Sequence, residues 1–83
     1  MIKNKMNNYS IEEVAFHNNE NDAWIIINDD VYDITDFLDE HPGGKMILMS
    51  VLGEDATEFF EELHNSRILK EYGDKYKIGT ILT

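Results

Sequence analysis

Residues 24–44 read WIIINDDVYDITDFLDEHPGG, and this stretch decides the fold class. Residues 24–27 and 31–34 are short runs rich in β-branched and aromatic side chains, which is typical of strands. The triplet 28–30 between them favours a tight turn, so we expect two consecutive strands. The HPGG segment at 41–44 breaks the chain sharply, because proline disfavours helical geometry in the residue before it and glycine permits close approach of the backbone.

Helical patterns surround the two expected strands. Upstream, Ser10 and Glu13 form a capping box for a short helix, which turn-favouring residues at 17–19 should end. Thr35 is placed to cap a helix through Glu40, and helical spacing follows at 45–52, 55–64 and 67–72, before a last strand at 76–81. Helices and strands that mix without regular alternation predict an α+β fold. We expect residues 1–8 to form a flexible tail and residues 9–83 to form one domain.

Composition limits the kinds of protein that this chain can be. Its 83 residues are 42% apolar, enough for one compact domain. The absence of cysteine excludes disulfides, thiolate metal sites, a cysteine nucleophile and thioether-linked haem. The longest apolar run, residues 23–27, is far below the roughly 20 residues that cross a bilayer. With no apolar N-terminal signal either, we expect a soluble, cytoplasmic protein without a membrane span.

The charge of the chain indicates what kind of partner it meets. Seventeen acidic and seven basic side chains give a formal net charge of -10, which repels the phosphates of nucleic acids. Residues 6–44 contain ten Asp and Glu and no Lys or Arg. Such a surface would attract a basic protein partner. We expect the chain itself to be a monomer that does not bind nucleic acid.

His41 and His64 are the candidate ligands of a cofactor. Each histidine lies at the edge of a predicted helix, and the two helices between them can form a V-shaped pocket. Apolar residues would line it: Phe37, Ile47, Leu48, Phe60 and Leu63. This lining suits a large, flat, apolar ligand such as haem, and two imidazoles would fill both axial positions of the iron, which favours electron transfer. The carbonyls of Gly44 and Phe60 are candidate acceptors for the other ring nitrogens.

Other readings of the same residues carry less weight. A zinc hydrolase would use His41, His64 and a carboxylate, but the sequence lacks the helical i, i+4 histidine pair of a common zinc arrangement. The carboxylates at 58, 61 and 62 are typical of a solvated helix face. We expect His17 to be a helix-end residue, and Met46 and Met49 to be partly buried in helix packing. A haem-binding or interaction module without redox activity remains the main alternative function.

The chain resembles the cytochrome b5 family over residues 9–81. The motifs that carry this resemblance are YSIEEV at 9–14, WIII at 24–27, VYDITDFL at 31–38, HPGG at 41–44, GEDATEFF at 53–60, His64 and YKIG at 76–79. The resemblance implies a small mixed sheet below short helices that form a haem pocket, with His41 and His64 as the axial ligands. It implies these apolar pocket positions: Ile27, Ile34, Phe37, Ile47, Leu48, Phe60, Leu63 and Ile78. Trp24 and Tyr32 match a second, structural core.

The resemblance also implies a function. Family members hold haem b non-covalently and pass single electrons from a flavin-containing reductase to a redox acceptor, so this chain is expected to be an electron carrier and not an enzyme. Lys45 and Met46 stand where many members have acidic residues, and Lys45 is expected to oppose attraction to a basic partner. Asn65-Ser66 follows His64, which leaves the residue that contacts a haem propionate open. No membrane-anchoring tail follows Thr83, unlike in the microsomal members, so we expect either a soluble acceptor or a domain excised from a longer chain.

Overall fold

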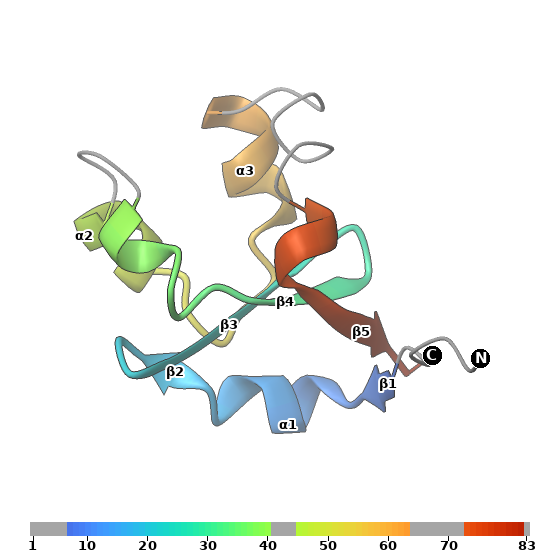
Figure 1. Cartoon of the computed structure of the whole chain (residues 1–83). Helices are drawn as coiled ribbons and strands as arrows, with labels where there is room; N and C mark the ends of the chain where they lie inside the picture. The colour runs from blue at the N-terminus through green and yellow to red at the C-terminus, as the bar shows by residue number, and fades with distance from the viewer. Residues whose placement is uncertain (1–6, 41–44, 64–72, 83) are drawn as a thin grey trace.

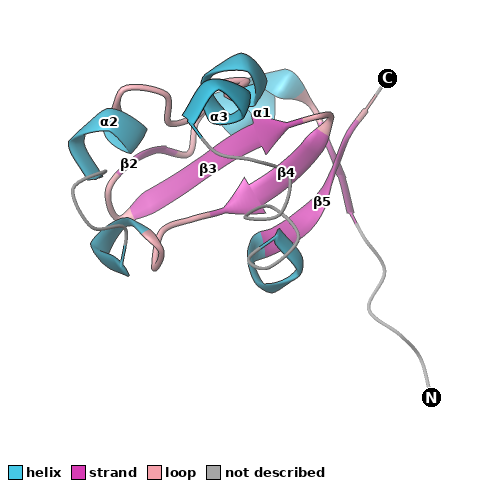
Figure 2. Ribbon diagram, turned by 90° about the horizontal axis from the view of Figure 1, so that it is seen from above, coloured by secondary structure: helices cyan, strands magenta, loops and turns pink. Residues whose placement is uncertain are grey.

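The computed structural model describes residues 7–40, 45–63 and 73–82 (Figure 1). Five strands form one mixed sheet in the order β1-β5-β4-β3-β2, and β3, β4 and β5 lie side by side in Figure 2. The strands are β1 (Asn7–Tyr9), β2 (Asn18–Asn19), β3 (Asp22–Ile27), β4 (Asp30–Asp33) and β5 (Lys77–Ile81). The helices are α1 (Ile11–Ala15), the 3-10 helix η1 (Leu38–Glu40), α2 (Lys45–Met49) and α3 (Thr57–Leu63), with a further helical turn at 73–76. The predicted α+β class is confirmed.

The hairpin of β3 and β4 forms as the sequence predicts. Its register places Trp24 opposite Asp33 and Ile27 opposite Asp30. The turn residues Asn28 and Asp29 have φ angles of 51° and 69°, and such left-handed geometry at both positions matches the right-handed twist of the flanking strands. Asn and Asp tolerate this conformation better than most residues, so the pair explains why the hairpin closes here.

The sheet has a different hydrophobic core on each face, because successive side chains of a strand point to opposite sides. One core contains Val14, Ile26 and Val31, packed against Tyr9, Trp24, Ile78 and Ile81. The larger core contains Ala23, Ile25, Ile27, Tyr32, Ile34, Leu38, Leu48, Leu52, Ala56 and Tyr76, packed against Phe37, Val51, Phe59 and Phe60. In Figure 1, α1 lies below the sheet, whereas α2 and α3 rise above it. These two sides are named the α1 face and the α2/α3 face.

Two edge strands replace segments that the sequence placed in a tail and in a turn. Asn7 and Asn8 belong to β1, so the tail boundary at residue 8 is wrong. β1 pairs with β5 in parallel, where a Cβ on Gly79 would collide with the Asn7 carbonyl and lie 2.7 Å from the Tyr9 ring. β2 occupies part of the expected turn and pairs with the start of β3. β1 takes its hydrogen bonds from β5, far away in the sequence, and β2 takes them from the neighbouring β3, and Asn-rich sequence predicts neither strand.

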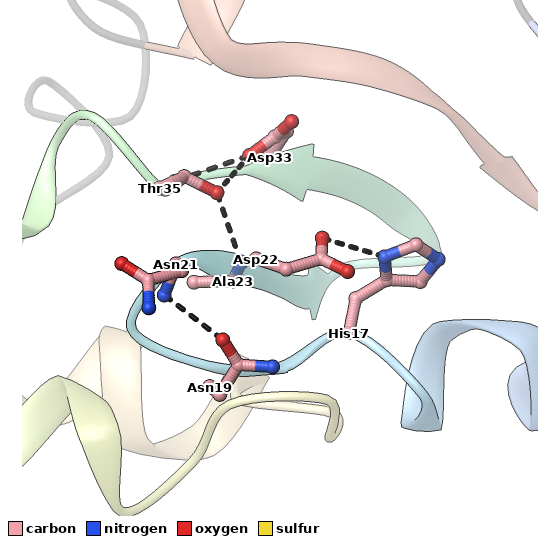
Figure 3. Close-up of polar contacts among 7 residues, drawn as sticks. All are labelled: His17, Asn19, Asn21, Asp22, Ala23, Asp33 and Thr35. Atoms are coloured by element: carbon pink, nitrogen blue, oxygen red, sulfur yellow. Dashed lines mark hydrogen bonds and ion pairs between the residues drawn. The ribbon is translucent and has the colours of Figure 1, made fainter.

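The helices are shorter than the sequence predicts. At α1 the capping box is confirmed, with the Ser10 hydroxyl accepting a hydrogen bond from the Glu13 amide at 3.0 Å. Thr35 does not cap a helix, because its hydroxyl accepts from the Ala23 amide at 2.9 Å and donates to Asp33 at 2.7 Å (Figure 3). A turn covers 35–37 and leaves only η1 helical. α2 stops at Met49, and turns lead to residue 53. The helix expected at 67–72 lies outside the described residues.

Candidate functional site

The two candidate haem ligands lie outside the residues that the structure describes. His41 falls in the gap at 41–44 and His64 in the gap at 64–72, so their role stays a prediction. The described chain nevertheless reaches both positions from one side of the sheet. η1 ends one residue before His41 and contributes Leu38 to the larger core, and α3 ends one residue before His64 and packs Phe60 on that core.

Most of the predicted pocket residues come together on the α2/α3 face. Ile27, Ile34 and Leu48 are buried in the larger core, and Phe37 and Phe60 pack against it as half-buried residues. Ile47 is on the same short helix as Leu48 but is 47% exposed. Leu63 is the last residue of α3, and its side chain is outside the described part.

Two residues pack on a different side of the sheet from the one that the sequence suggested. Ile78 packs against the core of the α1 face, so the structure does not bring it together with the other predicted pocket residues. Tyr32 was expected to share a structural core with Trp24. Instead Tyr32 is buried in the larger core, whereas Trp24 packs on the α1 face. The alternation of side chains along paired strands explains the separation of Tyr32 from Trp24, since Trp24 pairs with Asp33, the residue after Tyr32.

Helix α2 presents apolar side chains to solvent beside the larger core. Leu48 is its only buried residue, and Met46 and Met49 are 80% and 37% exposed. The expectation that both methionines are partly buried in helix packing is therefore wrong for Met46. Exposed apolar side chains that gather on one helix, beside a hydrophobic core, are typical of a surface that binds an apolar ligand or partner.

The described residues do not assemble a polar reaction centre on this face. Among residues 7–40, 45–63 and 73–82, no group of three or more His, Cys, Asp or Glu lies close enough to hold a metal ion. Glu58 and Glu61 on α3 are exposed, as the solvated-face interpretation predicts.

His17 has structural partners on the other side of the sheet. Its Nδ1 lies 2.7 Å from Asp22 Oδ1, as Figure 3 shows, and its ring stacks on Trp24 with 3.5 Å between centroids. Trp24 belongs to the core of the α1 face, away from α2 and α3. These contacts account for His17 without a ligand role.

Lys45 is not the free cation that the sequence suggested. Its Nζ lies 3.1 Å from Glu20 Oε2 and 3.1 Å from Asp39 Oδ1. The hydrogen bond to Glu20, followed by that to Asp39, raises the pKa of Lys45 above its ordinary value. Two carboxylates thus pair with this ammonium group. No local pattern predicts the pairing with Glu20, which lies in the turn between β2 and β3.

Comparison with known proteins places the chain in a family. The model of the cytochrome b5-like heme/steroid binding domain matches residues 10–82. The chain belongs to this family. It is 48% identical over 73 residues to cytochrome b5 of Borago officinalis, a match that covers 88% of this chain and 55% of that protein. It is 47% identical over 73 residues to a putative cytochrome b5 of Neurospora crassa, with 88% of each chain covered. The chain thus spans little more than half the length of its borage relative.

Solved structures support the same fold. Cytochrome b5 of Ostreococcus tauri virus 2 superposes with a TM-score of 0.83 and 45% identity, over 89% of this chain and 95% of that one. Cytochrome b558 of Ectothiorhodospira vacuolata, described as a prokaryotic homologue of cytochrome b5, gives a TM-score of 0.81 and 28% identity, over 92% and 99% of the two chains. The cytochrome b5-like fold expected from the sequence is confirmed.

Membership of the cytochrome b5 family confirms the expected cofactor class. The family binds haem b non-covalently, and its members are in general electron carriers and not enzymes in themselves. The residues that this chain gathers on the α2/α3 face fit such a group, since they are apolar and stand beside two helical segments that lead into histidines. In the described part of the chain, no helix is both long enough and apolar enough to cross a membrane.

Proposed function

We propose that this chain binds one haem b on the α2/α3 face through His41 and His64, and that it carries single electrons from a flavin-containing reductase to a redox acceptor protein. The observation that carries the proposal is the incomplete apolar surface of this face. Ile47 is 47% exposed next to Leu48, which is only 7% exposed, so α2 presents apolar side chains at the edge of the core that a further apolar group would cover. The family match makes haem the group of choice.

The described residues have distinct tasks in this proposal. Ile27, Ile34 and Leu48 form the floor, since they are buried in the core that the sheet and α2 share. Phe37 and Phe60 supply aromatic surface beside it. Together these side chains exclude water from the apolar part of the ligand. Leu63 is proposed to complete the wall on the α3 side, next to His64.

His41 and His64 would hold the haem, which would supply one-electron transfer when bound. Each imidazole has to present one nitrogen to the iron and keep the other hydrogen-bonded, which orients the ring and raises its basicity. We assign the carbonyls of Gly44 and Phe60 as these acceptors.

The reductase and the acceptor are inferred from charge as well as from the family. The chain carries a net charge of -10, and Lys45, the single basic residue from 6 to 66, is paired with two carboxylates. A basic redox partner would therefore be attracted at low ionic strength. A monomer in the cytoplasm remains the form that we expect for this exchange.

A haem titration of the purified chain tests the proposal. We expect one equivalent to give a six-coordinate, low-spin spectrum in both oxidation states, with no ready shift when carbon monoxide is added to the reduced form. His41→Ala and His64→Ala should each leave a weakly held, five-coordinate haem. His17→Ala is the matched control and should leave the spectrum unchanged, because His17 pairs with Asp22 on another side of the sheet. A high-spin spectrum of the wild type would overturn the assignment of both ligands.

Reduction by a reductase distinguishes an electron carrier from a haem-binding module without redox activity. A haem protein of the proposed spectrum that accepts an electron from a flavin-containing reductase, and passes it on to a haem-protein acceptor, is a carrier. The same spectrum without reduction by any reductase would support a haem-binding module without redox activity. A colourless protein that retains zinc would contradict both.

A further inference from the structure

Lys45 joins three segments that are separate in the sequence. It is the first residue of α2. Its Nζ lies 3.1 Å from Glu20, in the turn between β2 and β3, and 3.1 Å from Asp39, in η1. One ammonium group therefore ties the start of α2 to an edge of the sheet and to the helical turn that precedes it in the chain.

Helix α2 depends on such contacts for its position. It has five residues, and isolated helices of this length are not stable in water. Only Leu48 is buried, so one side chain anchors the helix in the core. A lysine in the first turn also opposes the helix dipole, so Lys45 does not stabilise α2 locally. The carboxylates of Glu20 and Asp39 offset this disadvantage, and they do so only when α2 lies where the structure places it.

We propose that Lys45 is a positioning residue that holds α2 in place as one wall of the haem pocket. This inference rests on the proposed function, because α2 carries the predicted pocket residues Ile47 and Leu48. The ion pairs fix the start of the helix, and Leu48 fixes its middle. Together they set how Ile47 covers the ligand.

The expected effect is moderate because the partners are partly exposed. The side chains of Lys45, Glu20 and Asp39 are 40%, 51% and 82% exposed. Breaking an exposed ion pair has a small effect, and here two pairs break together. We expect Lys45→Met to speed haem loss about two- to fivefold. High salt should bring the wild type close to the variant, because screening weakens the same pairs.

The experiment compares three variants of the haem-loaded chain. Lys45→Met removes the charge, and Lys45→Arg keeps a cation that reaches both carboxylates. Lys77→Met is the control for net charge, because Lys77 pairs with Asp30 at 3.3 Å between β5 and β4 and does not contact α2. Haem loss is followed by transfer to an excess of apomyoglobin, and amide hydrogen exchange is measured over residues 45–49.

The result expected is faster haem loss and faster exchange over residues 45–49 in Lys45→Met, with Lys45→Arg and Lys77→Met close to the wild type. Equal behaviour of Lys45→Met and Lys77→Met would overturn the inference. So would an Lys45→Arg variant that loses haem as fast as Lys45→Met. Failure of the proposed function is distinguishable, since the wild type would then not take up haem in a low-spin form, while the exchange measurement would still report on the tether.

Discussion

The two faces of the sheet differ in how completely the chain covers them. On the α1 face, Val14 and Val31 are fully buried, and Trp24 lies between two rings: His17 is stacked at 3.5 Å, and Tyr9 meets it edge-on at 4.8 Å between centroids. On the α2/α3 face, Ile47 and Met49 remain 47% and 37% exposed beside the larger core. The first core is closed by ring stacking within the chain. Beside the second core, apolar side chains of α2 remain exposed.

This difference separates folding from function. The α1 face gives the hairpin and α1 a core that needs no cofactor, so it can keep the sheet together when haem is absent. On the α2/α3 face, α2 has five residues and buries only Leu48, and Ile47, Met46 and Met49 are exposed, so we expect this helix to open more easily than the sheet. We therefore expect the stability of the fold and the binding of haem to change independently of each other. Four experiments test this expectation, from the largest expected effect to the smallest.

Removing haem should produce the largest difference between the two faces. A ligand present at 1,000 times its dissociation constant raises the free energy of unfolding by about 4 kcal/mol. This is comparable to the whole free energy of unfolding that the core of so small a domain supplies. We expect amide exchange over α2 and α3 to speed up by as much as about a thousandfold in the apo form, while β3 around Trp24 stays protected. Exchange measured on apo and holo chains checks this. Equal protection of the amides on both faces, in the apo form as in the holo form, would show that haem does not stabilise one face more than the other.

Truncating one isoleucine on each face should affect stability on the α1 face and haem binding on the α2/α3 face. Ile26→Ala, in the closed core and 3% exposed, should lower the free energy of unfolding by about 2–5 kcal/mol with or without haem. Ile47→Ala, 47% exposed, should change the apo form by only about 0.5 kcal/mol, yet speed haem loss. Urea unfolding of both apo variants, with haem-loss rates, gives the two numbers. An Ile47→Ala change that destabilises the apo chain as much as Ile26→Ala would show that both faces are equally closed.

A charge placed on each face tests where a redox partner docks. Met46 on α2 and Phe16 beside α1 are both 80% exposed, so each accepts a glutamate without loss of packing. If a basic partner meets α2, Met46→Glu should raise the second-order reduction rate about twofold at low salt, and Phe16→Glu should not. The Debye length falls from about 30 Å at 0.01 M to about 10 Å at 0.1 M, so the gain should fade with salt. Equal gains from both variants would mean that net charge alone matters.

The smallest effect concerns a tyrosine of the larger core at alkaline pH. Burial raises the pKa of Tyr32, and the carboxylates of Asp30 and Asp74 raise it further. The folded chain therefore favours the neutral phenol. Its contribution to stability is complete below the unfolded pKa of about 10 and is lost as pH rises through the folded pKa. Tyr32→Phe should flatten the fall of the urea midpoint above about pH 10, and an unchanged slope would contradict the assignment.

Local signals in the sequence predicted the centre of the fold. The β-branched runs and the turn at Asn28 and Asp29 gave the hairpin, and Ser10 with Glu13 gave α1. The edge strands β1 and β2 could not be predicted in this way, because they are two or three residues long and Asn-rich, and β1 takes its hydrogen bonds from β5, far away in the sequence. Thr35 is a similar case, since its hydroxyl is engaged by the amide of Ala23.

Only part of the candidate site could be predicted, because some of its positions also depend on how distant strands pair. Helical spacing and apolar character identified Leu48 and Ile47, whereas Ile27 and Ile34 were expected in the pocket only from the family resemblance. The side of the sheet on which Ile78 packs depends on how β5 aligns with β4, where the register shifts between Val31 and Tyr32. Such a shift changes which side chains face each core, and residues 76–81 alone do not encode it.

The position of β5 in the sheet determines the order in which the strands can pair during synthesis. β5 lies between β1 and β4, so the first strand to leave the ribosome has no neighbour until the last one has been made. At about 5–20 residues per second, β1 waits several seconds while α1 and the hairpin are already complete. The parallel pair closes only when Ile81 reaches Tyr9, and the next amide, that of Leu82, then donates to the Tyr9 carbonyl at 2.8 Å. A nascent chain halted before β5 would therefore leave both β1 and the outer edge of β4 without their partner strand.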